Sequence, residues 1–326
     1  YVGAVSSACF ADLGHSVVGV DINQLKLDLI MAGNSPIVEP GVEERIRKAI
    51  DEKRLSATTD VAKAVAETEV SLVSVGTPSA RDGLPDLGAL EHVCTEIGTA
   101  IAAKDTAHAV IIRSTIPPGT IRELVIPTLE KASGRKLDDG LVVASNPEFL
   151  REGSAVADFY SPPFTVSGSD TESGHAVIRE LYEGIEAPVR CVPFETAEAI
   201  KYLSNTYHAL KIAFANEVGS LLKTFGVDSR DAMELFCEDR QLNISSAYLR
   251  PGFAFGGSCL PKEVRSVSSF AAKRGISLDL LGDIPVSPVD TLARMKTKVH
   301  LPKLHSLSHR DAFPPALARY VSGHSA

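Results

Sequence analysis

The sequence predicts an α/β fold in which short buried strands alternate with helices and a long helix follows. Three observations lead to this prediction. Apolar runs of strand length alternate with helical patterns up to residue 145, and segment 1–21 has the order helix, glycine, strand, acid. Residues 196–223 form a long helical pattern with few helix-breaking residues. Such alternation is typical of a doubly wound parallel sheet.

Length and composition are those of an ordinary globular enzyme. The 326 residues, 44% hydrophobic and 23% charged, suggest two domains with a fragment of a third. The net charge of -8 gives no electrostatic surface for nucleic acid, and no apolar run approaches the length of a membrane span. Five cysteines without paired spacing indicate reduced thiols and a cytoplasmic location. We expect no bound metal.

The first 21 residues match the second half of a dinucleotide-binding βαβ unit. Residues 1–13 are predicted to be a helix that Gly14 ends, and residues 16–20 a strand that ends at Asp21. In such units this acid hydrogen-bonds the adenosine ribose, and an acid favours NAD over NADP. Gly3 would be the third glycine of the motif, which allows helix and strand to pack closely. The first strand and two glycines are missing, so we expect the chain to start inside the motif, although any α/β protein can contain a strand that ends in Asp.

Further elements continue the alternation. We predict helices at 61–67, 87–103 and 121–133, and strands at 70–75, 109–113 and 141–144. Glycine, proline and small polar residues gather at the strand ends, and ligands of open parallel sheets bind there. We therefore expect cofactor contacts from loops 76–79 and 114–120. The alternative is that these residues only terminate strands.

Two pairs of polar residues follow these strands. Glu148 and Glu152 lie just beyond the last strand, where catalytic groups gather. Lys201 and Asn205 are spaced i, i+4 and share one face of the long helix, where they could hold a substrate oxygen or a water molecule. The alternatives are solvated acids and a polar stripe on a packing helix. His208 is predicted to be an ordinary helix histidine.

Cys259 stands in a glycine-rich segment that favours reactivity. Two glycines and Ser258 precede it, and Pro261 and Lys262 follow. Serine as N-cap and proline in the first turn predict that a helix begins here. The helix dipole and the lysine ammonium would both favour the thiolate, as a nucleophile requires. The alternative is a buried structural cysteine, which is our prediction for the other four cysteines.

Together, these segments resemble the UDP-glucose/GDP-mannose dehydrogenase family of NAD-dependent nucleotide-sugar 6-dehydrogenases, from Tyr1 to about Val299. Within this family, three segments are more similar to the GDP-mannose members than to the UDP-glucose members: residues 37–39, 237–239 and 248–255. The resemblance as a whole rests on residues 1–3, 35–41, 75–78, 114–120, 146–152 and 256–262, and on the helix of Lys201 and Asn205.

The resemblance implies a four-electron oxidation at C6 of the sugar, with two NAD⁺ and no release of the aldehyde. Cys259 would add to the aldehyde to give a thiohemiacetal, and a second oxidation would give a thioester that water hydrolyses to the uronic acid. Lys201 would stabilise the alkoxide and later the oxyanion. Asn205 would donate a second hydrogen bond, and Glu152 would orient the water or accept its proton.

The resemblance also implies the members of each site. The predicted catalytic residues are Cys259, Lys201, Asn205, Glu152, Glu263 and Thr115. The predicted cofactor contacts are Tyr1, Val2, Gly3, Asp21, Lys26, Gly76, Thr77, Pro78, Ser114, Thr115, Glu152 and Lys262. The predicted substrate contacts are Glu148, Phe149, Leu150, Arg151, Lys201, Asn205, Tyr248, Arg250, Phe253, Phe255 and Gly256.

The chain departs from the family at Glu263, where the family usually has aspartate. An extra methylene can move a carboxylate by about 1 Å, and such misplacement can cost on the order of 10²-fold in rate. We interpret Glu263 as a change that tunes activity or as sequence noise, rather than as a loss of function, because the acid is kept.

The resemblance implies a Rossmann-like domain at 1–192 and an all-helical central domain at 193–299 that forms a homodimer. Residues 300–326 are an unassigned tail, and the family's C-terminal nucleotide-sugar domain is expected to be absent. Three alternatives stay open. They are a UDP-glucose or other UDP-sugar dehydrogenase, a β-hydroxyacid or 6-phosphogluconate type of dehydrogenase, and an inactive fragment that binds NAD or dimerises.

Overall fold

The computed structural model describes residues 1–81, 83–247, 249 and 259–284. The chain divides into two compact units, residues 1–207 and residues from 208 onward. The long helix α9 (Phe194–Thr224) begins in the first unit and ends in the second. The first unit contains the strands, and the described part of the second is helical.

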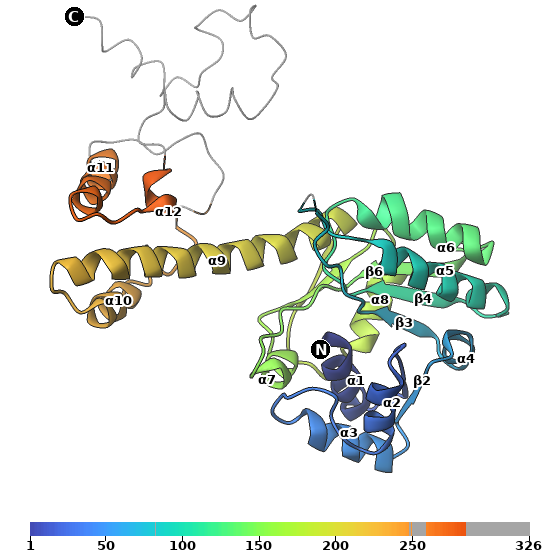
Figure 1. Ribbon diagram of the computed structural model, residues 1–326. Helices are drawn as coiled ribbons and strands as arrows, with labels where there is room; N and C mark the ends of the chain where they lie inside the picture. Colours follow the sequence, from blue (N-terminus) through green and yellow to red (C-terminus); the bar gives the residue numbers. More distant parts are fainter. Residues whose placement is uncertain (82, 248, 250–258, 285–326) are drawn as a thin grey trace, which may run out of the picture. The chain divides into compact units, whose positions relative to one another are not determined.

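Within the described residues, the strands of the first unit form two sheets (Figure 1). The smaller sheet consists of β1 (Val17–Val20) and β2 (Leu55–Thr58), which run parallel. Most strand pairs of the larger sheet are also parallel. In the larger sheet, β6 and β7 instead meet antiparallel, where Ser145 faces Gly168. The strand order of the larger sheet is β3 (Val70–Val73), β4 (His108–Ile112), β6 (Gly140–Ser145), β7 (Thr165–Gly168) and β8 (Val189–Val192), with β5 (Lys136–Leu137) on β6.

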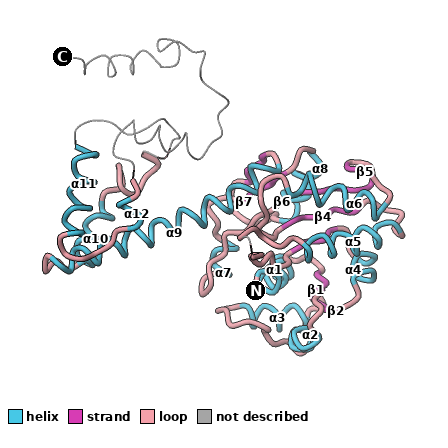
Figure 2. The backbone as a smooth tube through the Cα atoms, turned by 45° about the horizontal axis from the view of Figure 1, so that its top comes forward, coloured by secondary structure: helices cyan, strands magenta, loops and turns pink. Residues whose placement is uncertain are grey.

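Helices cover both faces of the larger sheet, as a doubly wound fold requires. Successive side chains of a strand point to opposite faces. In β4, Ile111 joins a core cluster with α1, α3, α7 and α8, whereas Val110 and Ile112 join a second cluster with α5 and α6. Helices α5 and α6 lie side by side on one face (Figures 1 and 2). The helices are α1 (Val2–Leu13), α2 (Gln24–Met31), α3 (Val42–Asp51), α4 (Val61–Glu67), α5 (Gly88–Ala102), η1 (Ile121–Val125), α6 (Ile126–Ser133), α7 (Ala155–Tyr160) and α8 (Glu172–Leu181).

The described part of the second unit contains the end of α9, α10 (Ser229–Glu238), α11 (Cys259–Ala272) and α12 (Asp279–Gly282). Its small core holds Leu221, Ala271 and Leu278. The Glu217 carboxylate accepts hydrogen bonds from Leu280 N (2.7 Å) and Leu281 N (3.1 Å), which otherwise lack partners at the start of α12. This carboxylate therefore fastens α12 to α9.

The local predictions agree with these elements. Gly14 ends α1 with a left-handed φ of 110°, which glycine adopts without steric cost. The predicted helix 61–67 has the same bounds as α4, and the predicted helix 121–133 begins with the π-helical turn η1. Other elements were not predicted from the sequence, namely the helices α2, α3, α7, α8, α10 and α12 and the strands β2, β5, β7 and β8.

His108 forms a buried polar contact at the start of β4. Its side chain is 1% exposed and contacts Ser71 Oγ through Nε2 (2.8 Å) and Lys104 Nζ through Nδ1 (3.1 Å). The ammonium donates to Nδ1, so Nε2–H donates to the Ser71 hydroxyl. Burial and the Lys104 charge lower the pKa of His108 from 6.5 to about 4. The imidazole is therefore neutral in the folded protein at physiological pH.

This shift predicts that acid destabilises the protein below pH 6.5. Above pH 6.5, His108 is neutral in both states; below it, the unfolded chain binds a proton that the folded ring does not bind until about pH 4. Stability should therefore fall by about 1.4 kcal/mol per pH unit from this group, or about 2 kcal/mol between pH 6.5 and pH 5. Urea unfolding at both pH values measures the loss.

The variant His108→Gln should lose this part of the pH dependence. His92→Gln is the control, because that side chain is exposed on α5 and should leave the dependence as it is in the unmodified protein. An equal pH dependence in His108→Gln and the unmodified protein would contradict the assignment.

Candidate functional site

The loops that follow β3, β4 and β6 meet at one edge of the sheet. The strands are parallel neighbours, with Val73 beside Ile112 and Ile112 beside Ser145, so their carboxyl ends lie together. The loops are also hydrogen-bonded to each other. Thr77 Oγ1 donates to Thr115 O (2.8 Å), and Ser114 Oγ donates to Val75 O (2.7 Å). The predicted cofactor loops 76–79 and 114–120 are thus joined, with Gly76 and Pro78 exposed.

Helix α1 begins at this same edge, with Tyr1 as its N-cap and Val2 as its first residue. The Tyr1 side chain makes no capping hydrogen bond, and uncapped N–H groups at a helix N-terminus attract phosphate. Gly3 faces Ser74 after β3, but an added methyl group would lie 4.0 Å from Ser74 Cβ, an ordinary contact. Packing against the described residues therefore does not explain why glycine stands here.

Asp21 directly follows β1, as the ribose-binding acid of a dinucleotide site would. Its carboxylate accepts from Asn23 N (2.9 Å) and pairs with Lys26 Nζ (3.1 Å). Burial alone would raise the pKa of Asp21, but these two hydrogen bonds hold it below its usual value. Asp21 is therefore ionised. Lys26, whose ammonium pairs with Asp21, is also among the predicted cofactor contacts, and its contact with the cofactor stays a prediction.

Glu148 and Lys201 form an ion pair that water barely reaches. Glu148 Oε1 lies 2.9 Å from Lys201 Nζ, and the two side chains are 11% and 10% exposed. The other carboxylate oxygen accepts from Leu150 N (2.5 Å). The ammonium also lies 5.5 Å from the centre of the Phe149 ring. The loop after β6 therefore holds the cation of α9, which the sequence analysis did not predict.

The remaining predicted residues of this loop differ in their surroundings. Phe149 packs edge to face on Phe164, with 5.6 Å between ring centres, and Leu150 packs against the core cluster of α1. Arg151 binds Asp158 through two nitrogens, so its guanidinium is engaged within the protein. Glu152 is exposed.

Asn205 lies one turn after Lys201 on α9 and is exposed, whereas Lys201 is buried. The i, i+4 spacing places both on one side of the helix. The structure therefore provides one buried cation and one accessible amide along this side.

Two buried acids that the sequence analysis did not select support the site. Glu198, 2% exposed, accepts from Gly119 N (2.6 Å) and Ile121 N (2.8 Å). Burial raises the pKa of Glu198, and these two N–H groups oppose that rise. Glu198 thus joins the start of α9 to the loop that carries Thr115. The sequence signal that could have identified Glu198 as part of the site is its position three residues before Lys201.

Glu39 is the second such acid. It is 7% exposed, and three donors surround its carboxylate: Tyr1 Oη, Gly153 N and Ala155 N. The acid lies between an exposed valine and a proline in the sequence, so no periodic pattern marks it as buried.

Several residues of the predicted site lie outside the part of the chain that the structure describes. Helix α11 begins at Cys259, as the sequence predicts, and Glu263 in its first turns is exposed. The contact of Cys259 with Lys201 stays a prediction, because the two residues belong to different units. The described residues do not include Tyr248, Arg250, Phe253, Phe255, Gly256 and the tail 300–326, nor the side chains of Cys259 and Lys262.

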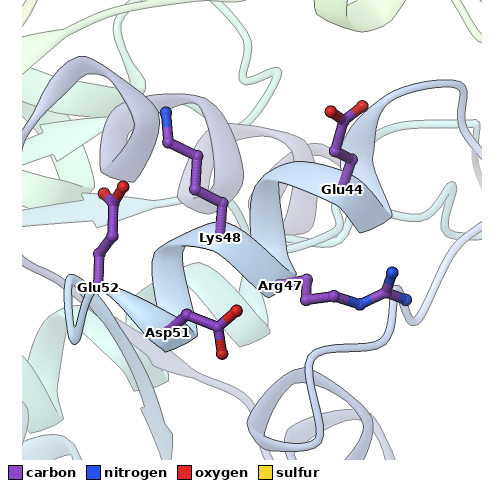
Figure 3. A pocket seen from close by; sticks show the side chains of 5 residues that line it. All are labelled: Glu44, Arg47, Lys48, Asp51 and Glu52. Carbon is purple, nitrogen blue, oxygen red and sulfur yellow. The ribbon is translucent and has the colours of Figure 1, made fainter.

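The described residues provide no cluster of candidate metal ligands and no bilayer-spanning helix. No group of three or more His, Cys, Asp or Glu side chains there is arranged to hold a metal ion. Nor is any helix in the same residues long and apolar enough to cross a bilayer. A surface hollow lies on α3 (Figure 3), lined only by charged side chains: Glu44, Arg47, Lys48, Asp51 and Glu52. We interpret this hollow as a solvated helix face.

Comparison with known proteins places both units in one family. Residues 1–186 match the NAD binding domain of the UDP-glucose/GDP-mannose dehydrogenase family, and residues 195–285 match its central domain. The GDP-mannose 6-dehydrogenase of Pseudomonas aeruginosa is 47% identical over 284 residues, which cover 87% of this chain and 65% of that protein. The UDP-glucose 6-dehydrogenase of Haloferax volcanii is 39% identical over 286 residues, covering 86% of this chain and 66% of that protein.

Solved structures agree with this comparison. The crystal structure of a ternary complex of GDP-mannose dehydrogenase from Pseudomonas aeruginosa matches with a TM-score of 0.88 and 44% identity. The match covers 93% of this chain and 70% of that one. A UDP-glucose dehydrogenase from Pyrobaculum islandicum matches with a TM-score of 0.71 and 38% identity, covering 91% of this chain and 66% of that one. The chain spans about two thirds of the length of these relatives.

The burial of the Glu148–Lys201 pair predicts a large loss of stability when one partner is neutralised. Glu148→Gln leaves the ammonium without a counter-charge and should lower the free energy of unfolding by about 3 kcal/mol. Adding Lys201→Met should recover much of this loss, because the unpaired buried charge is removed. Urea unfolding of the two single variants and the double variant measures the coupling.

Glu130→Gln is the matched control. Glu130 also pairs with a lysine (Lys136, 2.7 Å) and accepts a backbone N–H, but Lys136 is 73% exposed. This change should cost less than about 1 kcal/mol. Equal losses from Glu148→Gln and Glu130→Gln would show that burial does not matter here.

Proposed function

The chain belongs to the UDP-glucose/GDP-mannose dehydrogenase family, and we propose that it carries out the NAD-dependent oxidation of C6 of a nucleotide sugar to the carboxylate. The observation that carries the proposal is the buried Lys201 ammonium at the sheet edge where the dinucleotide helix begins. A cation shielded from water stabilises developing negative charge on a substrate oxygen far better than an exposed one. This is the group that oxidation of an alcohol needs.

The residues at the sheet edge fit NAD. Asp21 is an ionised acceptor at the end of β1, suited to ribose hydroxyls, and α1 presents its N-terminus without a side-chain cap. The joined loops of Thr77 and Ser114 would complete the cofactor contacts. NAD⁺ would supply the acceptor for one hydride each time it binds, so two NAD⁺ would be reduced for each sugar.

The other steps of the proposed reaction are carried out by residues of the chain itself. Lys201 would stabilise the alkoxide in the first oxidation and the oxyanion in thioester hydrolysis, with Asn205 donating a second hydrogen bond. The Cys259 thiolate would add to the aldehyde, forming a C–S bond, and this bond would break when water attacks the thioester. Glu152, exposed beside the site, would orient that water or accept its proton. Glu148 would hold Lys201 in place, and Thr115 would shape the cofactor side.

GDP-mannose is the substrate that we propose, with GDP-mannuronate as product. The greater identity to GDP-mannose 6-dehydrogenases, 47% against 39% for a UDP-glucose 6-dehydrogenase, supports this choice. A UDP-sugar is the alternative. A second candidate function is an NAD-binding unit without turnover, which the match of residues 1–186 to an NAD binding domain also supports.

We also propose a homodimer formed through the helical central domain, which the sequence places at 193–299. Large apolar side chains on its helices are exposed, including Leu210 at 45%, Ile212 at 63% and Leu235 at 70%. Where exposed apolar side chains adjoin, the surface that they form is usually covered by a partner, and here we propose that the partner is a second copy of the chain.

The covalent mechanism predicts that Cys259→Ser stalls the second half of the reaction. Serine is a much weaker nucleophile at neutral pH, so little thiohemiacetal analogue should form. In the protein at its native length, NADH should fall from two per sugar to at most one, with little uronate. Absorbance at 340 nm and mass spectrometry measure both, with GDP-mannose and UDP-glucose offered in parallel. Full uronate formation by the variant would rule out the covalent step.

The cofactor assignment predicts that Asp21→Asn weakens NAD binding about tenfold. A hydrogen bond to a charged group contributes about 1.5 to 3 kcal/mol, and the neutral amide loses part of it. Isothermal titration calorimetry measures the affinity. Asp28→Asn is the control, because Asp28 lies on neighbouring α2 and its carboxylate accepts only from Gln24 among the hydrogen bonds described for this side chain. Unchanged affinity in Asp21→Asn would refute the ribose contact.

A further inference from the structure

Glu39 joins its own segment to two others that lie far from it in the sequence. Its Oε2 accepts from Tyr1 Oη (2.6 Å) and Gly153 N (2.7 Å), and its Oε1 accepts from Ala155 N (2.8 Å). The first segment is the start of the dinucleotide helix, and the other contacts lie where the loop after β6 enters α7. A carboxylate with three donors at such distances is held firmly.

The backbone that presents Glu39 is itself anchored. Ser35 Oγ donates to Ile37 O (2.7 Å), which forms a tight turn just before the acid. Glu39 O accepts from Val42 N, and Val42 is fully buried in the core cluster at the start of α3. The turn therefore fixes the position of the Glu39 carboxylate, and the carboxylate in turn fixes the position of the loop that it binds.

The groups around Tyr1 show what this contact controls. Burial raises the pKa of the Tyr1 phenol, and the carboxylates of Glu39, Glu152 and Glu148 raise it further. Glu152 immediately precedes Gly153, whose N–H binds Glu39 and whose φ of 86° favours glycine. Glu152 makes none of the hydrogen bonds described for this loop, so its location follows from the backbone that Glu39 holds.

We propose that Glu39 is a positioning residue, which sets the place of Glu152 relative to the dinucleotide helix and thereby governs the hydrolytic half of the reaction. This inference rests on the proposed function, in which Glu152 acts on the attacking water. Glu39 itself is enclosed by its three donors and would touch neither substrate nor cofactor. Its effect should therefore fall on the rate of the second half more than on cofactor affinity.

The test compares Glu39→Gln with the unmodified protein at its native length. A glutamine keeps the size of the side chain but presents one NH₂ group, which cannot accept, so Gly153 N or Ala155 N loses its acceptor. We expect amide exchange of residues 150–156 to rise at least tenfold and kcat to fall about 10²-fold, as for a misplacement of about 1 Å. The Kd for NAD should change less than threefold. In single-turnover reactions a covalent sugar adduct should accumulate on the protein, and intact-mass spectrometry measures it.

Two further variants complete the design. Glu39→Asp keeps the charge on a shorter side chain, so kcat should lie between the other two values, and it replaces Glu39→Gln if the latter fails to fold. Asp60→Asn is the control, because Asp60 caps α4 through Lys63 N (2.9 Å) as Glu39 caps α7. Its kcat should stay within twofold of the unmodified value.

The outcomes separate the two proposals. Unchanged exchange at residues 150–156 in Glu39→Gln, or faster exchange with unchanged kcat, overturns the positioning role. A loss of NAD affinity equal to the loss of kcat also overturns it, because Glu39 would then act on the cofactor. If the unmodified protein oxidises no nucleotide sugar, the proposed function fails together with the catalytic part of this inference, while the exchange measurement still judges whether Glu39 holds the loop.

Discussion

A buried ammonium needs a counter-charge, and the arrangement of this sheet edge depends on that need. Lys201 is 8% exposed, and an isolated charge at such a place costs several kcal/mol. Glu148 meets the need at 2.9 Å, but only while its loop stays close to α9. The backbone N–H of Leu150 holds the carboxylate, so the loop and the ion pair stabilise each other.

Backbone N–H groups are the common partner of the buried acids in the first unit. Glu198 binds two of them and joins α9 to the loop of Thr115, and Glu39 binds two and joins the loop of Glu152 to α1. Loops at strand ends leave such donors without partners in secondary structure, and a buried unpaired donor is costly. Acids at these places satisfy the donors and, in doing so, define how the loops lie relative to each other.

The sequence predicted the elements whose signals are local and strong. The helix 61–67, the glycine after α1 and the helix start at Cys259 were all found from periodicity and capping residues. Helix α3 was missed, although its buried apolar residues Val42, Ile46 and Ala49 recur at helical spacing with charged residues between them, as in an amphipathic helix. Strands β7 and β8 are four residues each and contain serine, glycine or arginine, so no apolar run marks them.

The sequence by itself determined the family, the strand that ends at Asp21 and the segments that carry the proposed site residues. Each of these follows from residues that are close in the chain, where spacing and residue type decide the local conformation. Only the tertiary structure decided which acid meets which donor. Glu148 and Lys201 are 53 positions apart, and Glu39 and Gly153 are 114 apart. Such contacts depend on how the strands order themselves in the sheet, and local periodicity carries no information about that order.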